Sequence, residues 1–332
     1  MKLTQSLLLK SHNLAKNKSA TRLFNISQQL NAPHNSLLQN VYRRFAVQNP
    51  PGIGSSTAKN QENSDSNAEQ IDTTFNRFKA GVFVLPHIQK RHKGGEDAAV
   101  LTDRVLSVAD GVGGWAEQNV DPAKFARRLC QNIVDLVFKN DDRYKVNPRQ
   151  LLTDAVYENK EVGSCTCVLT VLDEDSPVLY TANLGDSGYM ILRKEGIDLV
   201  TQFRSKEQQH SFNFPFQVGT GGDDPMKADV QTHDVRHNDI LILGSDGLWD
   251  NLYDVKVIDL VRPFIRDTDE IADPELVAEM IATEAEKYSN QQNYLSPFAK
   301  GARQFYYDYN GGKPDDITVI VAQVNLKDSK KI

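Results

Sequence analysis

The 332 residues of the chain are 39% hydrophobic and 8% aromatic, which is enough for one large core or two modest ones. The formal net charge of −6 is divided unevenly, because residues 1–61 contain eight of the 38 Lys and Arg residues and none of the 44 Asp and Glu residues. The rest of the chain therefore has a net charge of −14, which disfavours binding to nucleic acid phosphates. No apolar run approaches the roughly 18 residues that span a bilayer, so no transmembrane segment is expected.

Residues 1–46 have the composition of a mitochondrial presequence. This segment is basic, rich in Ser and Asn, free of acidic residues, and places Leu3, Leu7 and Leu14 on one helical face. It ends at Arg43-Arg44-Phe45-Ala46, a candidate processing region. The alternative is a disordered basic tail. Residues 47–72 are rich in Asn, Ser, Gly, Pro and Gln, which predicts a disordered linker before a folded domain at residues 73–327.

The folded part alternates strand-like and helix-like segments. A first strand is expected at Ala80–Pro86, and Asp121-Pro122 and Asn147-Pro148 each have the capping residue and proline that begin a helix. The later expected elements are an antiparallel meander at 168–172, 178–184 and 188–193, helices at 254–264 and 273–288, and flaps or substrate-recognition loops at 212–236 and 289–313. Strands and helices in this order predict an α+β layered sandwich.

Short acidic strings lie at the ends of the apolar runs. Rigid strands hold such carboxylates at one edge of a sheet, where they repel one another unless cations neutralise them. Oxygen ligands of this kind suit Mg²⁺ or Mn²⁺. Taken singly, each string is more often a turn than a ligand. The strings are Glu96-Asp97, Asp110-Gly111, Asp186-Ser187-Gly188, the run from Asp246 to Asp250, and Asp315-Asp316.

The order of these strings resembles the signature of the type 2C metal-dependent serine/threonine protein phosphatases, from about Phe78 to Val324. Two strings are similar to the small mitochondrial branch of that family: Val112-Gly113-Gly114-Trp115 and the run from Glu207 to Gln217. The full set of matching strings is Glu96-Asp97, Ala109-Asp110-Gly111-Val112-Gly113-Gly114-Trp115, Gly163-Ser164-Cys165-Thr166, Asn183-Leu184-Gly185-Asp186-Ser187, Ser245-Asp246-Gly247-Leu248-Trp249-Asp250 and Pro314-Asp315-Asp316-Ile317-Thr318-Val319.

The resemblance implies a four-layer sandwich of two antiparallel sheets flanked by helices, with a site for two metals, Mn²⁺ or Mg²⁺, at one end. Asp110 would bridge the metals, the Gly111 carbonyl would bind one of them, and Glu96 would orient water on the other. The residues implied in the chemistry are Glu96, Asp97, Asp110, Asp246 and Asp315. The implied metal ligands are Asp110, Gly111, Asp246 and Asp315, with Asp186 and Asp250 for a weaker third metal. Asp316 would support these ligands without binding a metal itself.

The activity implied is hydrolysis of phosphoserine and phosphothreonine in proteins by metal-activated water, without a phosphoenzyme. The implied partners are phosphoproteins of the mitochondrion, in the matrix, and enzymes of coenzyme Q biosynthesis are possible targets by resemblance alone. Cys165 and Cys167 share one face of a strand outside any phosphate-cradling loop, which argues against a cysteine-dependent phosphatase. They are expected to be packed, unbridged thiols.

Two departures from the family pattern leave roles open. Many relatives have His after the Asp-Gly pair as the general acid, and here that residue is Val112. A metal-bound water or His92 is then the alternative acid. The phosphate-gripping arginine is also not clearly aligned. Arg91 is preferred because its guanidinium can bind phosphate through two donors, with Lys93 as a second candidate.

Two other functions remain as alternatives. A catalytically weak pseudophosphatase would keep the fold and use its cleft to bind a phosphoprotein. A two-metal nuclease would share the carboxylates, but the acidic domain disfavours it.

Overall fold

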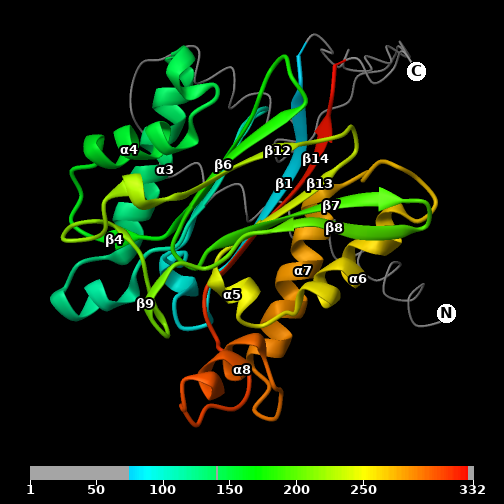
Figure 1. Cartoon of the computed structure of the whole chain (residues 1–332). Helices are drawn as coiled ribbons and strands as arrows, with labels where there is room; N and C mark the ends of the chain where they lie inside the picture. The colour runs from blue at the N-terminus through cyan, green and yellow to red at the C-terminus, as the bar shows by residue number, and fades with distance from the viewer. Residues whose placement is uncertain (1–74, 140, 328–332) are drawn as a thin grey trace, which may run out of the picture. The chain divides into compact units, whose positions relative to one another are not determined.

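A computed structural model describes residues 75–139 and 141–327 (Figure 1). These residues belong to one compact unit, Gln70–Ile332. The predicted presequence at 1–46 and linker at 47–72 lie outside the described residues. No helix in the described ranges combines the length and the apolar character needed to cross a membrane.

Ten strands form two five-stranded sheets in which every neighbouring pair is antiparallel. The first sheet has the order β1-β14-β13-β7-β8 and the second the order β12-β6-β5-β3-β2. The strands of the first sheet are β1 (Arg77–Leu85), β14 (Ile317–Asn325), β13 (Ile240–Gly244), β7 (Gly188–Glu195) and β8 (Asp198–Arg204). Those of the second are β12 (Asp229–Asp234), β6 (Val178–Leu184), β5 (Cys167–Leu172), β3 (Val105–Ala109) and β2 (Ala98–Leu101).

The two sheets pack face to face over a shared apolar core. Leu106 and Val108 of one sheet meet Leu243 and Ile320 of the other in this layer. Since both sheets also have an apolar outer face, nearly every side chain of β3, β5, β13 and β14 is buried.

Helices cover both outer faces, so the fold has four layers, as predicted (Figure 1). The helices α3 (Pro122–Phe138) and α4 (Pro148–Glu158) pack on the β2 to β12 sheet, and α6 (Asp254–Ile265) and α7 (Pro274–Ser289) pack on the other. The capping signals functioned as expected: Asp121, Asn147 and Asp273 each accept a hydrogen bond from a backbone amide of the first turn. Cys130, Cys165 and Cys167 are buried free thiols in the core beneath α3 and α4.

Shorter elements lie at the edges of the sandwich. The β9 and β10 strands pair with each other, and β11 pairs with β4. These elements are η1 (Arg91–Lys93), η2 (Gly113–Gln118), η3 (Asp142–Tyr144), β4 (Ser164–Cys165), β9 (Gln209–Ser211), β10 (Phe214–Pro215), β11 (Val218–Gly219), η4 (Pro225–Lys227), α5 (Asp246–Trp249) and α8 (Pro297–Gln304).

The expected three-stranded meander is wrong at its last step. The strands β5 and β6 do pair, but β7 leaves for the other sheet, where it lies between β13 and β8. The chain crosses at Gly185, whose φ of 105° lies in the region that favours glycine. Two expected loops also contain regular structure, because 212–236 includes β12 and 289–313 includes α8.

Candidate active site

The acidic strings converge at one end of the sandwich because of where their strands end. Asp110 follows β3 and Asp246 follows β13, whereas Asp97 precedes β2 and Asp315 precedes β14. In antiparallel neighbours, the end of one strand and the start of the next lie at the same edge. Asp186 joins them from the crossing between β6 and β7, so the cluster draws on both sheets.

Asp110 is at the centre of this cluster. Its burial, followed by the charges of Asp97, Asp246, Asp315 and Asp186, holds its pKa well above the usual range for an aspartate. Ionisation of Asp110 is therefore disfavoured, which is the behaviour of crowded carboxylates that have no cation to separate them.

Two lysine ammonium groups partly neutralise the cluster. The Nζ of Lys313 lies 2.5 Å from Asp246 and 2.7 Å from Asp250, and the Nζ of Lys90 lies 2.6 Å from Glu96 and 3.4 Å from Asp315. Burial disfavours both charged amines, but the surrounding carboxylates outweigh it and raise both lysine pKa values. Burial alone would raise the pKa of Asp246, and Lys313 lowers it instead.

Asp97 lies beneath the cluster as a buried support. Its Oδ2 accepts hydrogen bonds from Ser245 Oγ at 2.8 Å and Thr318 Oγ1 at 2.7 Å, so it joins the starts of β2 and β14 to the end of β13. Its burial, and then the charge of Asp316, raise its pKa to about 7. The other oxygen, Oδ1, is buried and has no hydrogen-bond partner among the described residues.

Asp316 ties the β1–β2 loop to the start of β14. Its carboxylate accepts backbone hydrogen bonds from His87 at 2.6 Å and Glu96 at 2.8 Å, and it lies 3.3 Å from Lys90. These contacts hold Glu96 at the margin of the cluster. Asp316 thus acts on the backbone of its neighbours, in agreement with the supporting role implied for it.

Gly111 occupies a place where the backbone is closely surrounded. A Cβ there would stand 2.6 Å from the Pro122 carbonyl and 2.7 Å from the Glu96 carbonyl. The glycine therefore allows the chain after Asp110 to pass between the start of α3 and Glu96. A side chain at this position would separate the Asp110 loop from Glu96.

Asp186 and Asp250 lie on the side of the cluster near Lys313. Burial and the charge of Asp246 raise the pKa of Asp186 well above its usual range. Burial raises the pKa of Asp250 to about 7, even though Lys313 opposes this shift. The structure thus brings both residues into the same acidic cluster as Asp110.

The phosphate-binding candidates lie in the η1 turn at the rim. Arg91 forms an ion pair with Glu286 of α7 and donates to the Pro86 carbonyl, and Lys93 is exposed. Their neighbour Lys90, which the sequence analysis did not select, is the residue of this turn that reaches the carboxylates. His92 is exposed in the same turn.

The residues of the cluster suit divalent cations by their chemistry. Within residues 75–139 and 141–327, no three His, Cys, Asp or Glu side chains are already gathered around one point as ligands, and the lysines instead share the carboxylates. The buried oxygens Asp97 Oδ1 and Asp246 Oδ1 nevertheless have no partner among the described residues. Crowded carboxylate oxygens, two of which lack a partner among the described residues, are donors that Mg²⁺ or Mn²⁺ would satisfy.

Sequence reasoning missed Lys90, Lys313, Ser245 and Thr318. Lys313 directly precedes Pro314-Asp315-Asp316, so a cation beside an acidic string was a signal that could have been used. Ser245 and Thr318 lie next to acidic strings, but nothing in their spacing indicated that both would bond to Asp97.

Comparison with known proteins gives consistent similarities. A family model described as stage II sporulation protein E (SpoIIE) matches residues 95–325. The chain is 36% identical over 296 residues to "Probable protein phosphatase 2C 55" of Arabidopsis thaliana, covering 87% of this chain and 61% of that protein. It is 38% identical over 248 residues to "Protein phosphatase PTC7 homolog" of Xenopus laevis, covering 69% of this chain and 81% of that protein.

Among solved structures, the photosystem II phosphatase PBCP is similar with a TM-score of 0.68 and 31% identity, covering 75% of this chain and 99% of that one. The present chain spans about three fifths of the length of the two plant relatives that match it first, at 61% and 59%. The residues matched by the family model include all of the acidic strings and every strand of the two sheets except β1.

Proposed function

Because the chain belongs to the protein phosphatase 2C family, we propose that it hydrolyses phosphoserine and phosphothreonine in proteins. The observation that carries this proposal is the convergence of Asp97, Asp110, Asp246 and Asp315 from both sheets. The activity is proposed for this chain alone, because two of its plant relatives are longer proteins.

Asp110, Asp246 and Asp315 and the carbonyl of Gly111 would hold two Mn²⁺ or Mg²⁺ ions. The ions, when bound, would activate water for direct attack on phosphorus and offset the charge of the phosphoryl oxygens. Asp97 supports this arrangement from below through Ser245 and Thr318. Glu96, whose backbone amide donates to the Asp316 carboxylate, would orient water at the rim.

The residues of the chain also govern how the ions enter. The raised pKa of Asp110 favours its protonated form, so this carboxyl would release a proton when it becomes a ligand. Lys313 and Lys90 keep the cluster together until then, because they offset charges that would otherwise repel. Lys90 is also a third positive group at the rim, beside Arg91 and Lys93, that could meet a phosphate.

The basic leader supports a mitochondrial location, in the matrix, with phosphoproteins there as substrates. Its charge would be drawn by a negative-inside membrane potential, at about 2.3 kcal/mol per charge per 100 mV. A fluorescent reporter fused after residue 46 should enter mitochondria. A reporter that stays diffuse would favour the basic tail.

Phosphate release from a phosphothreonine peptide tests the activity. We expect hydrolysis with Mn²⁺ or Mg²⁺, none after exhaustive chelation with EDTA, and recovery when the ion is returned. Full activity after chelation would exclude the two-metal proposal. Binding of the phosphopeptide without hydrolysis under any ion would instead support a pseudophosphatase.

A further inference from the structure

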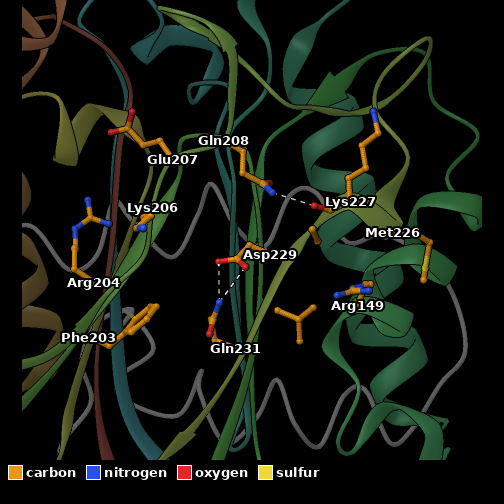
Figure 2. A pocket seen from close by; sticks show the side chains of 12 residues that line it. Arg149, Phe203, Arg204, Lys206, Glu207, Gln208, Met226, Lys227, Asp229 and Gln231 are labelled. Atoms are coloured by element: carbon orange, nitrogen blue, oxygen red, sulfur yellow. Dashed lines mark hydrogen bonds between the residues drawn. The ribbon is translucent and has the colours of Figure 1, made fainter.

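A pocket of about 740 Å³ lies outside the acidic cluster, and none of the aspartates of the cluster lines it. Its walls come from the start of α4, from η4, from the end of β8 with the segment that follows, and from β12. Figure 2 shows Arg149 and Met226 on one side of the pocket and Arg204, Lys206 and Glu207 on the other. The pocket is thus shared between the helical layer and both sheets.

The lining is rich in positive charge for so acidic a domain. Four cationic side chains, those of Arg149, Arg204, Lys206 and Lys227, stand against two acidic ones, those of Glu207 and Asp229. The surrounding residues 62–332 have a net charge of −14. A positive pocket in a negative domain attracts anionic groups locally.

Not all four cations are available to a ligand. Arg204 pairs with Asp254 and lies over the Trp249 ring at 3.7 Å, and Lys227 lies 3.1 Å from Asp223. Arg149 and Lys206, by contrast, form no ion pair within residues 75–139 and 141–327. These two residues are therefore the ones that can meet an incoming anion.

Arg149 has an unmet hydrogen bond inside the pocket wall. Its Nε is buried and has no partner among the described residues. No protein acceptor among the described residues therefore holds this guanidinium through its Nε. A guanidinium binds the two oxygens of a carboxylate side by side, which makes a carboxylate the natural acceptor here.

Two lining residues, Glu207 and Gln208, bring one wall of the pocket close to the acidic cluster. The backbone amide of Gln208, which lines the pocket, donates to the Gly185 carbonyl at 2.8 Å, one residue from Asp186. Glu207 is close enough to Asp246 and Lys313 for its pKa to respond to both charges. A peptide whose phosphorylated residue lies over the cluster would therefore place a neighbouring side chain in the pocket.

We propose that this pocket binds an acidic side chain next to the phosphorylated residue of the substrate, through Arg149 and Lys206. This inference rests on the proposed phosphatase function and adds a substrate preference to it. The four cations and two carboxylates of the lining leave it with a net positive charge. Arg149 and Lys206 are the two of these cations that form no ion pair within the described residues.

The test compares phosphothreonine peptides that are identical except that the residues flanking the phosphorylated position are Glu in one and Gln in the other. For the unaltered protein, we expect kcat/KM to be about fivefold or more higher for the Glu peptide, mainly through KM. In the double variant Arg149→Gln and Lys206→Gln, the ratio should fall to about one. The double control Lys124→Gln and Arg128→Gln, on the exposed face of α3, should keep the preference.

Two further measurements separate the inference from the proposed function. Hydrolysis of p-nitrophenyl phosphate, which has no flanking residues, reports the metal site alone. All three substrates are hydrolysed if the chain is a phosphatase. If the Glu and Gln peptides are then hydrolysed at equal rates, the inference is overturned and the phosphatase function stands. If nothing is hydrolysed, fluorescence anisotropy of the labelled Glu and Gln peptides with Mn²⁺-loaded protein still decides, because equal affinities would overturn the inference.

Discussion

The ammonium of Lys313 lies 2.7 Å from a carboxylate oxygen of Asp250 and also contacts Asp246. It therefore occupies the space between the two residues that resemblance assigns, with Asp186, to a third metal. While the Lys313 ammonium fills this space, the chain would hold two metal ions. With a neutral side chain at position 313, a third ion would have room to bind. Its side chain is only 17% exposed, so a competing cation must displace it from a confined place.

Lys313→Met should therefore raise the Mn²⁺ content after equilibrium dialysis from about two to about three ions per chain. Without metal, the variant should be less stable by about 3–5 kcal/mol at most, because two carboxylates lose a buried partner. Metal analysis and thermal unfolding in EDTA measure the two effects. Lys300→Met, on the exposed face of α8, is the control and should change neither. Equal Mn²⁺ content in all three proteins would contradict the displacement idea.

Asp246→Asn should abolish phosphopeptide hydrolysis while the protein remains folded. The change removes a metal ligand, yet it also relieves repulsion with Asp110 and Asp186. Against this, it weakens the contact with Lys313, so we expect metal-free stability within about 1 kcal/mol of the original. Circular dichroism melting and phosphate release provide the measurements, and Asp259→Asn on the exposed part of α6 is the control. Normal turnover at saturating Mn²⁺ would remove Asp246 from the site.

The metal-free protein should lose stability as the pH rises from about 4 to 7. Asp97 and Asp250 have pKa values raised to about 7 in the folded state, so between these pH values the folded chain binds more protons than the unfolded chain. Stability is then greatest at the acidic end of the window. Each pKa unit corresponds to about 1.4 kcal/mol, so the total fall should be a few kcal/mol.

Chemical denaturation in EDTA across this pH range measures the effect. Asp97→Asn should flatten the profile, since the amide oxygen can still accept from Ser245 and Thr318 and has no proton to lose. Mn²⁺ should also flatten it, because bound cations favour the ionised carboxylates. A profile that rises with pH in EDTA would show that other groups dominate.

Gly247→Ala should disrupt the site through the backbone. A Cβ at Gly247 would stand 2.0 Å from the Asp316 carbonyl, and neither α5 nor the start of β14 can shift without moving ligands. We expect a loss of at least about 2 kcal/mol in stability and weaker Mn²⁺ binding. Gly114→Ala is the matched control, because nothing lies within 4 Å of a Cβ at that position. Similar melting temperatures for the two variants would refute the prediction.

Val112→His tests the identity of the general acid. An imidazole beside Asp110 could protonate a seryl or threonyl leaving oxygen, whereas p-nitrophenolate leaves without a proton. We expect the variant to speed phosphopeptide hydrolysis more than p-nitrophenyl phosphate hydrolysis. His92→Ala should slow the peptide selectively if the exposed His92 is the acid. An equal effect of His92→Ala on both substrates would leave a water as the acid.

Local signals in the sequence predicted the layers and the acidic cluster, but not how the strands are shared between the sheets. Capping residues such as Asp121 and Asn147 act within one turn, so they are visible in the sequence. The step from β6 to β7 was misjudged because a strand buried on both faces has the same composition in either sheet. Tyr189 shows the outcome, since its hydroxyl bonds Thr181 from the opposite sheet at 2.7 Å.

The roles of Lys90 and Lys313 were hidden for a different reason. A lysine has a long, flexible stem, and spacing along the chain does not tell whether its ammonium turns to solvent or to a carboxylate. Arg91 and Lys93 were the phosphate-binding candidates from the sequence. The residue that reaches the cluster is their neighbour Lys90. Only the tertiary arrangement decides between such adjacent cations.

Because the chain passes from one sheet to the other at Asp186, the proposed ligands belong to two layers that are joined mainly by apolar packing. A slip of one layer by a single residue, about 3.3 Å, would carry Asp110 away from Asp246. Ion affinity would then report the alignment of the layers. Substitutions deep between them, as at Leu243 or Ile320, should weaken ion binding before they unfold the chain.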